Sequence, residues 1–466
     1  MSRPPEPGRG STGHKIEQAI EKAFDPLATA LKRATTPAKA APGKPGLEIS
    51  PLAVPFPVIP PIGGVEIATA RAGFYKHERD DLVVFSFARG TTCAGVFTRH
   101  KIGSAPVDWC KRQLDAEGGG QDVRALVVNA GCANAFTGKA GADAARRTAS
   151  EAAKRFGCRQ RDVMLASTGV IGVVLDDRKI VARMPEIEAG LDPDGWARAG
   201  QAILTTDTFP KGAWTECEIE GRKVRIAGIA KGSGMIAPDM ATMLAFIVTD
   251  AAIAPPVLRA LLGLHVRTTF NSVTVDGDTS TNDSFILIAT GQGNAKFESV
   301  TAPGWNEFKQ AVIDVARELA QAIVRDGEGA TKYIEIAVAG GRTHEECKAV
   351  GYAIGHSPLV KTAFFASDPN LGRILAAIGY AWNNDPALAD LDDTKVKVWL
   401  GSGGNEILVS ENGGRAASYQ EEAGAAMMKP AEITIRVDLG RGSQAARVWT
   451  CDFSYDYVKI NADYRS

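Results

Sequence analysis

The chain has 466 residues, with 53 lysines and arginines against 54 aspartates and glutamates, so its formal net charge is −1. This balance argues against a nucleic-acid-binding protein. No apolar run approaches the ~18 residues of a membrane span, so none is expected. The N-terminus lacks the apolar core of a secretory signal. Seven scattered cysteines without a C-x-x-C pair indicate neither a zinc site nor a disulfide framework, so we expect a cytoplasmic protein with no metal site.

Residues 1–46 differ from the rest of the chain, being rich in proline, alanine, lysine and glycine. Apolar side chains recur there at helical spacing, which predicts a short amphipathic helix over about 15–33, broken at Pro26. We interpret 1–46 as a flexible leader that contains this helix. Acidic residues within the helix disfavour a transit peptide.

From Leu47 onward the pattern is that of an α/β protein. Short apolar, β-branched runs predict strands over 81–87, 123–128, 162–167, 243–250, 284–290, 333–340, 395–401 and 432–440. A hairpin is predicted over 215–230, with its turn at Gly221-Arg222. Helices are predicted over 141–156, 255–268, 305–325 and 370–380. Strands outnumber helices in several places, which disfavours a simple alternating βαβ arrangement.

The densest candidate segment is KGSGMIAPDMATML, residues 231–244. A glycine-rich turn that leads into a strand is its plainest interpretation. A dinucleotide-binding fingerprint is disfavoured, because Pro238 and a strand follow where that motif requires a helix. A third interpretation is chemical: Thr242 becomes an N-terminal nucleophile if the bond after Ala241 breaks, with its own α-amine as the base. An α-amine, with a pKa near ~7.7–8.0, suits neutral pH far better than a lysine amine.

Other segments place polar groups next to predicted strands. Thr168-Gly169 can direct a hydroxyl and a backbone N–H at one point, as an oxyanion hole requires. TTDTFPK (205–211) gathers polar groups in one loop, and NAGCANAFTG (129–138) could present backbone N–H groups to an anion. Glu328 lies between two glycines, and the closing YVKINADYRS has apolar side chains that could dock a terminus which would otherwise fray. An ordinary turn, cap or frayed end is the alternative in each case.

Together these segments resemble the ornithine acetyltransferase family, also called the bifunctional glutamate N-acetyltransferase / amino-acid acetyltransferase. The resemblance covers about 50–466. It rests on KGSGMIAPDMATML, TTDTFPK, STGVIG, SAPV, DGDTSTND, DPNLGRILAA and NADYRS, with NAGCANAFTG as a variant of the family's NSGNANAFTG. The chain departs from the family at Ala130, Cys132 and Ser466, where serine, asparagine and threonine are usual.

The resemblance implies a role for each matched residue. Thr242 is expected to be the nucleophile, first in cleavage after Ala241 and then in acetyl transfer, with Thr168 and Gly169 as the oxyanion hole. The expected substrate contacts are Thr205 or Thr206, Lys231, Thr242, Glu328, Asn461 and Ser466. Lys231 would pair with an α-carboxylate, and Glu328 with the ornithine ammonium.

It also implies transfer of the acetyl group of N2-acetyl-L-ornithine to L-glutamate in arginine biosynthesis, through an acetyl-Thr enzyme. No cofactor is expected, with acetyl-CoA as an alternative donor in bifunctional members. The expected fold is a layered mixed-sheet α/β sandwich with outer helices, of the self-processing N-terminal-nucleophile type, plus a smaller C-terminal α/β domain. Chains 47–241 and 242–466 would assemble as an α2β2 heterotetramer. The alternatives are a self-processing amidase or aminopeptidase of the same type, which would hydrolyse the acyl-enzyme, and a non-enzymatic relative.

Overall fold

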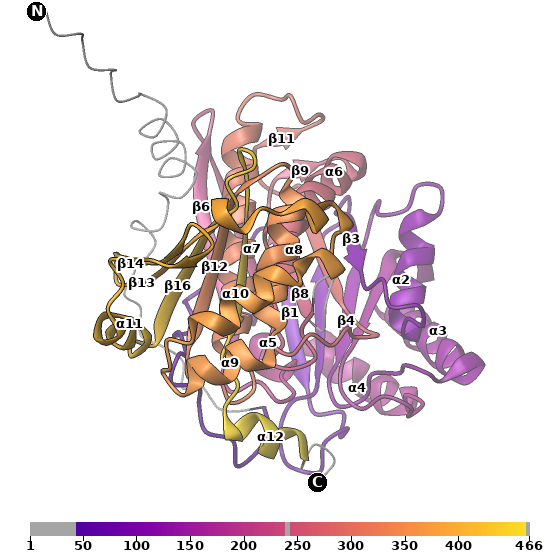
Figure 1. Ribbon diagram of the computed structural model, residues 1–466. Helices are drawn as coiled ribbons and strands as arrows, with labels where there is room; N and C mark the ends of the chain where they lie inside the picture. The colour runs from indigo at the N-terminus through magenta and orange to yellow at the C-terminus, as the bar shows by residue number, and fades with distance from the viewer. Residues whose placement is uncertain (1–42, 238–242, 463–466) are drawn as a thin grey trace, which may run out of the picture. The chain divides into compact units, whose positions relative to one another are not determined.

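The fold is that of a computed structural model, which describes residues 43–237 and 243–462 (Figure 1). The helix predicted over 15–33 lies outside the described residues, as do Ala241, Thr242 and Ser466. In the described part of the chain, no helix is long and apolar enough to cross a membrane.

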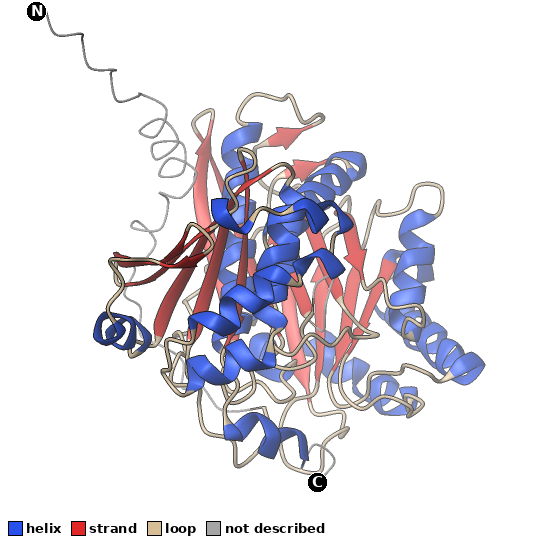
Figure 2. Ribbon diagram, viewed as in Figure 1, coloured by secondary structure: helices blue, strands red, loops and turns tan. Residues whose placement is uncertain are grey.

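The first sheet has four strands in the order β1 (Val65–Ala70), β2 (Leu82–Phe87), β4 (Ala125–Asn129) and β5 (Val163–Ser167). The pairing of β4 with β5 is parallel, and the other two pairings are antiparallel. Helices α2 (Ala105–Asp115), α3 (Gly138–Arg155) and α4 (Asp177–Ala189) cover the face to which Val127 and Leu165 point (Figure 2). The opposite face packs on a second sheet.

The second sheet has five strands in the order β3 (Thr92–Phe97), β10 (Ser284–Ala289), β8 (Leu244–Thr249), β7 (Arg222–Lys231) and β6 (Lys211–Ile219). Only the β10–β8 pairing is parallel. The Phe85 ring of the first sheet lies 6.0 Å from the Phe246 ring of the second, while the face that carries Ile247 packs against α6 (Pro255–His265) and α7 (Trp305–Arg325). These elements form a helix–sheet–sheet–helix sandwich, with α5 (Trp196–Ala202) beside Phe85 and the short pair β9 (Ala252–Ile253) and β11 (Lys296–Phe297) alongside.

A third, mixed sheet follows in the order β15 (Gly414–Arg415), β14 (Asn405–Glu411), β13 (Lys397–Ser402), β16 (Glu432–Asp438), β12 (Tyr333–Gly341) and β17 (Gln444–Cys451). It has its own hydrophobic core with α8 (His344–His356), α9 (Pro358–Phe365), α10 (Leu371–Gly379) and α11 (Glu421–Met428). Side chains alternate along its strands, so that Ile334 and Val448 belong to this core whereas Tyr333 and Trp449 pack in the core of α7. Helix α12 (Tyr455–Ala462) ends the described chain.

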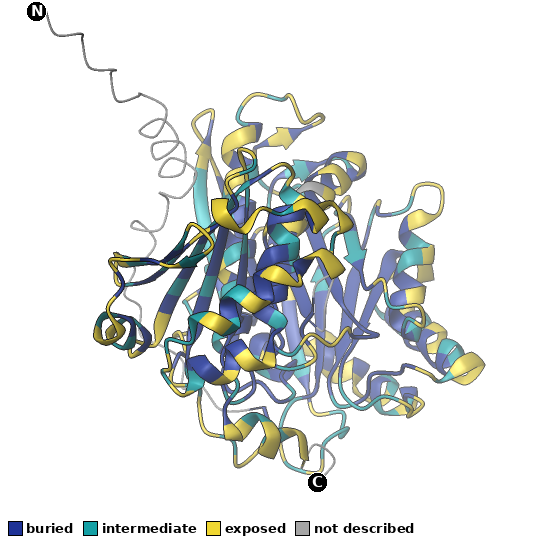
Figure 3. Cartoon of the chain, viewed as in Figure 1, coloured by how far each residue is buried: buried dark blue, intermediate teal, exposed yellow. Residues whose placement is uncertain are grey.

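Four strands, β4, β5, β8 and β10, are buried along their whole length (Figure 3). Burial on both faces explains why each is a nearly continuous apolar run, and why the sequence predicts them so well. The expected layered α/β class with mixed sheets and outer helices is confirmed. The hairpin prediction was wrong by one residue: Glu220 and Gly221 form the turn, with φ of 50° and 75°, because a tight two-residue turn needs positive φ at both positions.

Candidate active site

The candidate site lies where β7 ends and where β8 and β10 begin. Lys231 is the last residue of β7 and pairs with Leu244, the first residue of β8. Leu244 pairs on its other side with Ser284, the first residue of β10. The start of β8 is therefore held by a strand on each side, and Thr242 precedes it by two residues.

Lys231 connects the two sandwich sheets. Its ammonium nitrogen Nζ donates to the Thr168 hydroxyl at 3.2 Å, just beyond β5, and to the Thr205 hydroxyl at 2.9 Å. The side chain is only 4% exposed, and burial lowers the pKa of Lys231 although Asp207 opposes the shift. A cation held in this state binds an anionic ligand strongly, because little water competes for it.

The turn at Thr168-Gly169 depends on a glycine. Gly169 has φ of +126°, and a Cβ there would lie 2.4 Å from the Gly131 carbonyl carbon. Residues 129–138 pack directly on this turn: the Ala133 N–H donates to the Val170 carbonyl at 3.0 Å. Residues 129–138 and the turn at Thr168-Gly169, which were predicted as separate candidate segments, thus pack together beside Lys231.

A buried ion network that the sequence analysis did not predict supports the 205–211 loop. Lys211 Nζ lies 2.7 Å from an Asp207 carboxylate oxygen and 2.5 Å from one of Asp326, and all three side chains are fully buried. Burial raises the pKa of Asp326 to about 6, whereas Lys211 and Lys231 overcome the effect of burial on Asp207 and keep its pKa below the ordinary value. The Asp207 carboxylate also accepts the N–H of Gly232 at 2.6 Å, which fixes the backbone next to Lys231.

Glu328 lies in the loop that follows α7 and connects to the 205–211 loop through Ser233. Its backbone N–H donates to the Ser233 carbonyl at 2.8 Å, and the Ser233 hydroxyl hydrogen-bonds Thr206 at 2.8 Å. The Glu328 carboxylate accepts a hydrogen bond from the Asn461 side-chain amide at 2.7 Å. The last described helix, α12, therefore contacts the loop that contains Glu328. A Cβ on Gly234 would lie 2.5 Å from that carboxylate, which explains why a glycine occupies position 234.

The segment DGDTSTND, residues 276–283, holds the chain on both sides of residues 238–242. The Asp276 carboxylate accepts the N–H groups of Met235 and Ile236 at 2.5 and 2.9 Å. The Asp283 carboxylate accepts the N–H of Met243 at 2.9 Å. This segment contributed only to the resemblance, although its three aspartates in eight residues were a signal for a functional role.

Seven of the predicted residues therefore gather in one region: Thr168, Gly169, Thr205, Thr206, Lys231, Glu328 and Asn461. Their roles stay predictions. Among the described residues, no three histidine, cysteine or acidic side chains group as metal ligands would. The seven cysteines are all described and none forms a disulfide.

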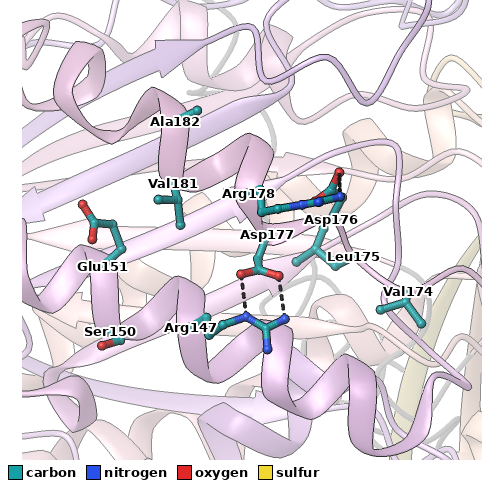
Figure 4. Close-up of a pocket in the computed structure, with 10 residues that line it drawn as sticks. All are labelled: Arg147, Ser150, Glu151, Val174, Leu175, Asp176, Asp177, Arg178, Val181 and Ala182. Carbon is teal, nitrogen blue, oxygen red and sulfur yellow. Dashed lines mark hydrogen bonds and ion pairs between the residues drawn. The ribbon is translucent and has the colours of Figure 1, made fainter.

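A separate hollow of about 910 Å³ lies between α3 and α4 (Figure 4). Its charged side chains are paired: Arg147 with Asp177 at 2.7 Å, Arg178 with Asp176 at 2.7 Å, and Glu151 with Arg155, which lies outside the lining, at 2.9 Å. None of the predicted site residues lines it. Since its charges are already neutralised, it offers no unpaired group for chemistry.

Comparison with known proteins identifies the family. The ArgJ family model matches residues 66–466. The arginine biosynthesis bifunctional protein ArgJ of Caulobacter vibrioides is 57% identical over 414 residues, which are 89% of this chain and 100% of that protein. The protein of the same name from Neisseria meningitidis is 49% identical over 410 residues, 88% of this chain and 97% of its own length. A crystal structure of the Bacillus halodurans protein is 37% identical and covers 47% of this chain and 99% of that one, with a TM-score of 0.43. The chain belongs to the ArgJ family, as the resemblance of its motifs to the ornithine acetyltransferases predicted.

Proposed function

We propose that this chain, an acetyltransferase of arginine biosynthesis, moves the acetyl group of N2-acetyl-L-ornithine to L-glutamate through an acetyl ester on Thr242. One observation carries the proposal: Lys231 Nζ donates to the Thr168 and Thr205 hydroxyls at 3.2 and 2.9 Å, and Lys231 pairs with Leu244, the first residue of β8. A buried cation and two hydroxyls suit the binding of a carboxylate and of a developing oxyanion, and Thr242 precedes the first residue of β8 by two positions in the sequence.

The first reaction is self-cleavage. The Thr242 hydroxyl attacks the Ala241 carbonyl carbon, the C–N bond breaks as the hydroxyl proton passes to the leaving nitrogen, and the acyl group remains on the hydroxyl oxygen as an ester. Water then hydrolyses the ester, which leaves a carboxylate on Ala241 and a free α-amine on Thr242. Residues 1–241 and 242–466 become two chains.

The second reaction uses the same hydroxyl. Thr242 attacks the acetyl carbonyl of N-acetylornithine, and its α-amine takes the hydroxyl proton. The oxyanion is stabilised by the Thr168 hydroxyl and the Gly169 N–H. When the acetyl C–N bond breaks, the α-amine returns the proton to the leaving amine of ornithine. Glutamate then attacks the ester through its own neutral amine, and the proton it loses returns to the Thr242 oxygen.

Substrate recognition follows from the charges. Lys231 pairs with the α-carboxylate that both substrates share. The 205–211 loop supplies the hydroxyls of Thr205, which bonds Lys231, and of Thr206, which bonds Ser233. Glu328 pairs with the side-chain ammonium of ornithine, with Asn461 holding its carboxylate in place. Ser466 is proposed as a further contact.

The alternative is an amidase of the same self-processing type, in which water accepts the acyl group. The two functions differ in what happens to the acetyl-enzyme. In a transferase the ester persists until glutamate arrives, and initial rates give parallel double-reciprocal lines. In an amidase ornithine is released continuously without glutamate.

The test is mass spectrometry of the purified protein quenched after mixing with N-acetylornithine alone. We expect one added acetyl group on the 242–466 chain, its loss on addition of glutamate, and formation of N-acetylglutamate. Thr242→Ala should give a single uncleaved chain without the adduct, whereas Thr242→Ser, which keeps a hydroxyl, should retain some cleavage. An N-terminus of the smaller fragment other than Thr-Met-Leu-Ala, or steady ornithine release without glutamate, would refute the proposal.

Three further expectations belong to this proposal. Acetyl-CoA is a second donor, in keeping with the name bifunctional that both relatives carry, and an assay with acetyl-CoA as sole donor tests it. The processed chains assemble as an α2β2 heterotetramer, which native mass spectrometry would detect. The protein acts in the cytoplasm, an expectation that the seven unbridged cysteines support.

A further inference from the structure

The segments that carry Lys231 and Glu328 are joined by hydrogen bonds of their backbones. The Ser233 carbonyl, two positions after Lys231, accepts the Glu328 N–H at 2.8 Å. Between these residues, the Gly232 N–H donates to the Asp207 carboxylate at 2.6 Å. Lys231 and Glu328 are both buried and carry opposite charges. Two side chains that are far apart in the sequence are therefore held in one place by main-chain contacts on either side of them.

A series of buried charges joins the same two segments a second time. Lys231 Nζ lies 3.9 Å from the Asp207 carboxylate. Lys211 Nζ lies 2.7 Å from Asp207 and 2.5 Å from Asp326, and these three side chains are fully buried. Asp326 precedes Glu328 by two positions, so the contacts close into a ring. Movement of any member would leave a buried charge without its partner, which is strongly destabilising, so we expect the ring to be stiff.

Asp326 connects this ring to the loop after α7. It directly follows the helix, and its carboxylate accepts the Thr208 N–H at 2.9 Å and the Thr208 hydroxyl at 2.5 Å. Burial raises the pKa of Asp326 to about 6, so the carboxylate is charged at a pH well above that value. The charged carboxylate thus fixes the loop that carries Glu328 against the 205–211 loop.

We propose that Asp326 is a positioning residue that fixes the separation of Lys231 and Glu328 and thereby selects the donor by the length of its side chain. The inference rests on the proposed function, in which Lys231 pairs with the α-carboxylate and Glu328 with the side-chain ammonium. A donor with the ornithine side chain places one charge on each residue. N2-acetyl-L-lysine is one methylene longer, and it meets both residues only if the two segments move apart, which the ring resists.

Asp326→Asn tests this, because asparagine keeps an oxygen for the Thr208 N–H but removes the charge that binds Lys211. The measurement is kcat/KM for N2-acetyl-L-ornithine divided by kcat/KM for N2-acetyl-L-lysine, with L-glutamate as acceptor at about pH 8, where wild-type Asp326 is charged. One methylene changes kcat/KM by about 10–200-fold in a fitted site, so we expect a wild-type ratio of about ten or more. In Asp326→Asn the ratio should fall about fivefold or more, because the loosened segments admit the longer donor.

Asp162→Asn is the matched control. Asp162 is also a buried carboxylate in an ion pair, and it accepts the Arg159 N–H at 3.0 Å. It lies directly before β5, whereas Thr168 directly follows that strand, so the change is made at the opposite end of the sheet from Lys231. The control should keep the wild-type ratio.

An unchanged ratio in Asp326→Asn would overturn the inference, since a purely structural role lowers kcat/KM for both donors equally. A wild-type ratio near one would also overturn it. If Asp326→Asn does not fold, Thr208→Val decides, because it removes the hydroxyl that Asp326 binds and keeps every charge of the ring. Its ratio should fall about twofold or more, and an unchanged ratio refutes the assignment. Absence of acetyl transfer in the wild type would instead refute the proposed function, so the two failures are distinguishable.

Discussion

The Asn461 side-chain amide donates a hydrogen bond of 2.7 Å to Oε2 of Glu328, although the two residues are 133 positions apart in the chain. Helix α12 thereby brings the C-terminal part of the chain to the loop that follows α7. Both residues lie in the proposed chain 242–466, so the contact does not depend on how the two processed chains associate. We expect acetyl transfer to require this contact and self-cleavage to proceed without it.

Deletion of residues 461–466 should leave self-cleavage intact and impair acetyl transfer. Cleavage requires Thr242 and a nearby oxyanion hole, whereas transfer also requires Glu328 to hold an ornithine ammonium. We expect KM for N-acetylornithine to rise about tenfold or more, because a hydrogen bond to a charged group contributes about 1.5–3 kcal/mol. Steady-state kinetics and gel analysis of the two fragments check this. Lys459→Ala, an exposed change on the same helix, is the control; unaltered KM in the truncated protein would contradict the assignment.

Gly169→Ala should abolish both cleavage and transfer. The added Cβ would lie 2.4 Å from the Gly131 carbonyl carbon, so the turn that presents Thr168 has to move. Gly172→Ala is a matched control, because Gly172 also has a positive φ, of 84°, but nothing lies within 4 Å of its Cβ position. The control carries only the strain of a left-handed residue, about 1–2 kcal/mol. Intact mass of the two purified variants distinguishes them, and a fully cleaved Gly169→Ala protein would contradict the oxyanion-hole role.

Lys231→Met should raise stability at neutral pH and abolish acetyl transfer. The folded pKa of Lys231 is lowered from 10.5 by burial, so its contribution to stability is present above pH 10.5 and is lost as pH falls through the lowered value. Lys231 lies 3.9 Å from Asp207, whereas Lys211 lies 2.7 Å from it, so Asp207 keeps its nearer partner when methionine removes the desolvated charge of Lys231.

The gain from Lys231→Met should shrink as the pH approaches 10.5, since the wild-type lysine is then neutral. Thermal unfolding of the variant and the wild type between pH 7 and about 10.5 measures this difference. Lys223→Met, at the exposed start of the same strand, should leave Tm nearly unchanged at every pH. A lower Tm for Lys231→Met at pH 7 would mean that Lys231 contributes net stability in its charged form.

Local patterns predicted the buried strands and several helices. Residues 163–166 and 285–289 are apolar without interruption because β5 and β10 are buried on both faces. Helix α3 was predicted from 141, three residues late, because its first turn has neither an acidic residue nor a side-chain cap to mark it. Strand β14 was not predicted, since five of its seven residues, from Asn405 to Leu408 and at Glu411, are exposed or half-buried.

The sequence by itself determined the family and predicted which residues carry the chemistry, since the motifs and their order are properties of neighbouring positions. Only the tertiary structure decided which distant groups meet: Lys231 with Thr168 across two sheets, Lys211 with Asp326, and Asp283 with Met243. Such contacts depend on strand order and on the packing of layers, which no local pattern records. An aspartate in a loop looks like a turn residue until the fold buries it against a particular backbone N–H, and burial is what turns that contact into a strong constraint.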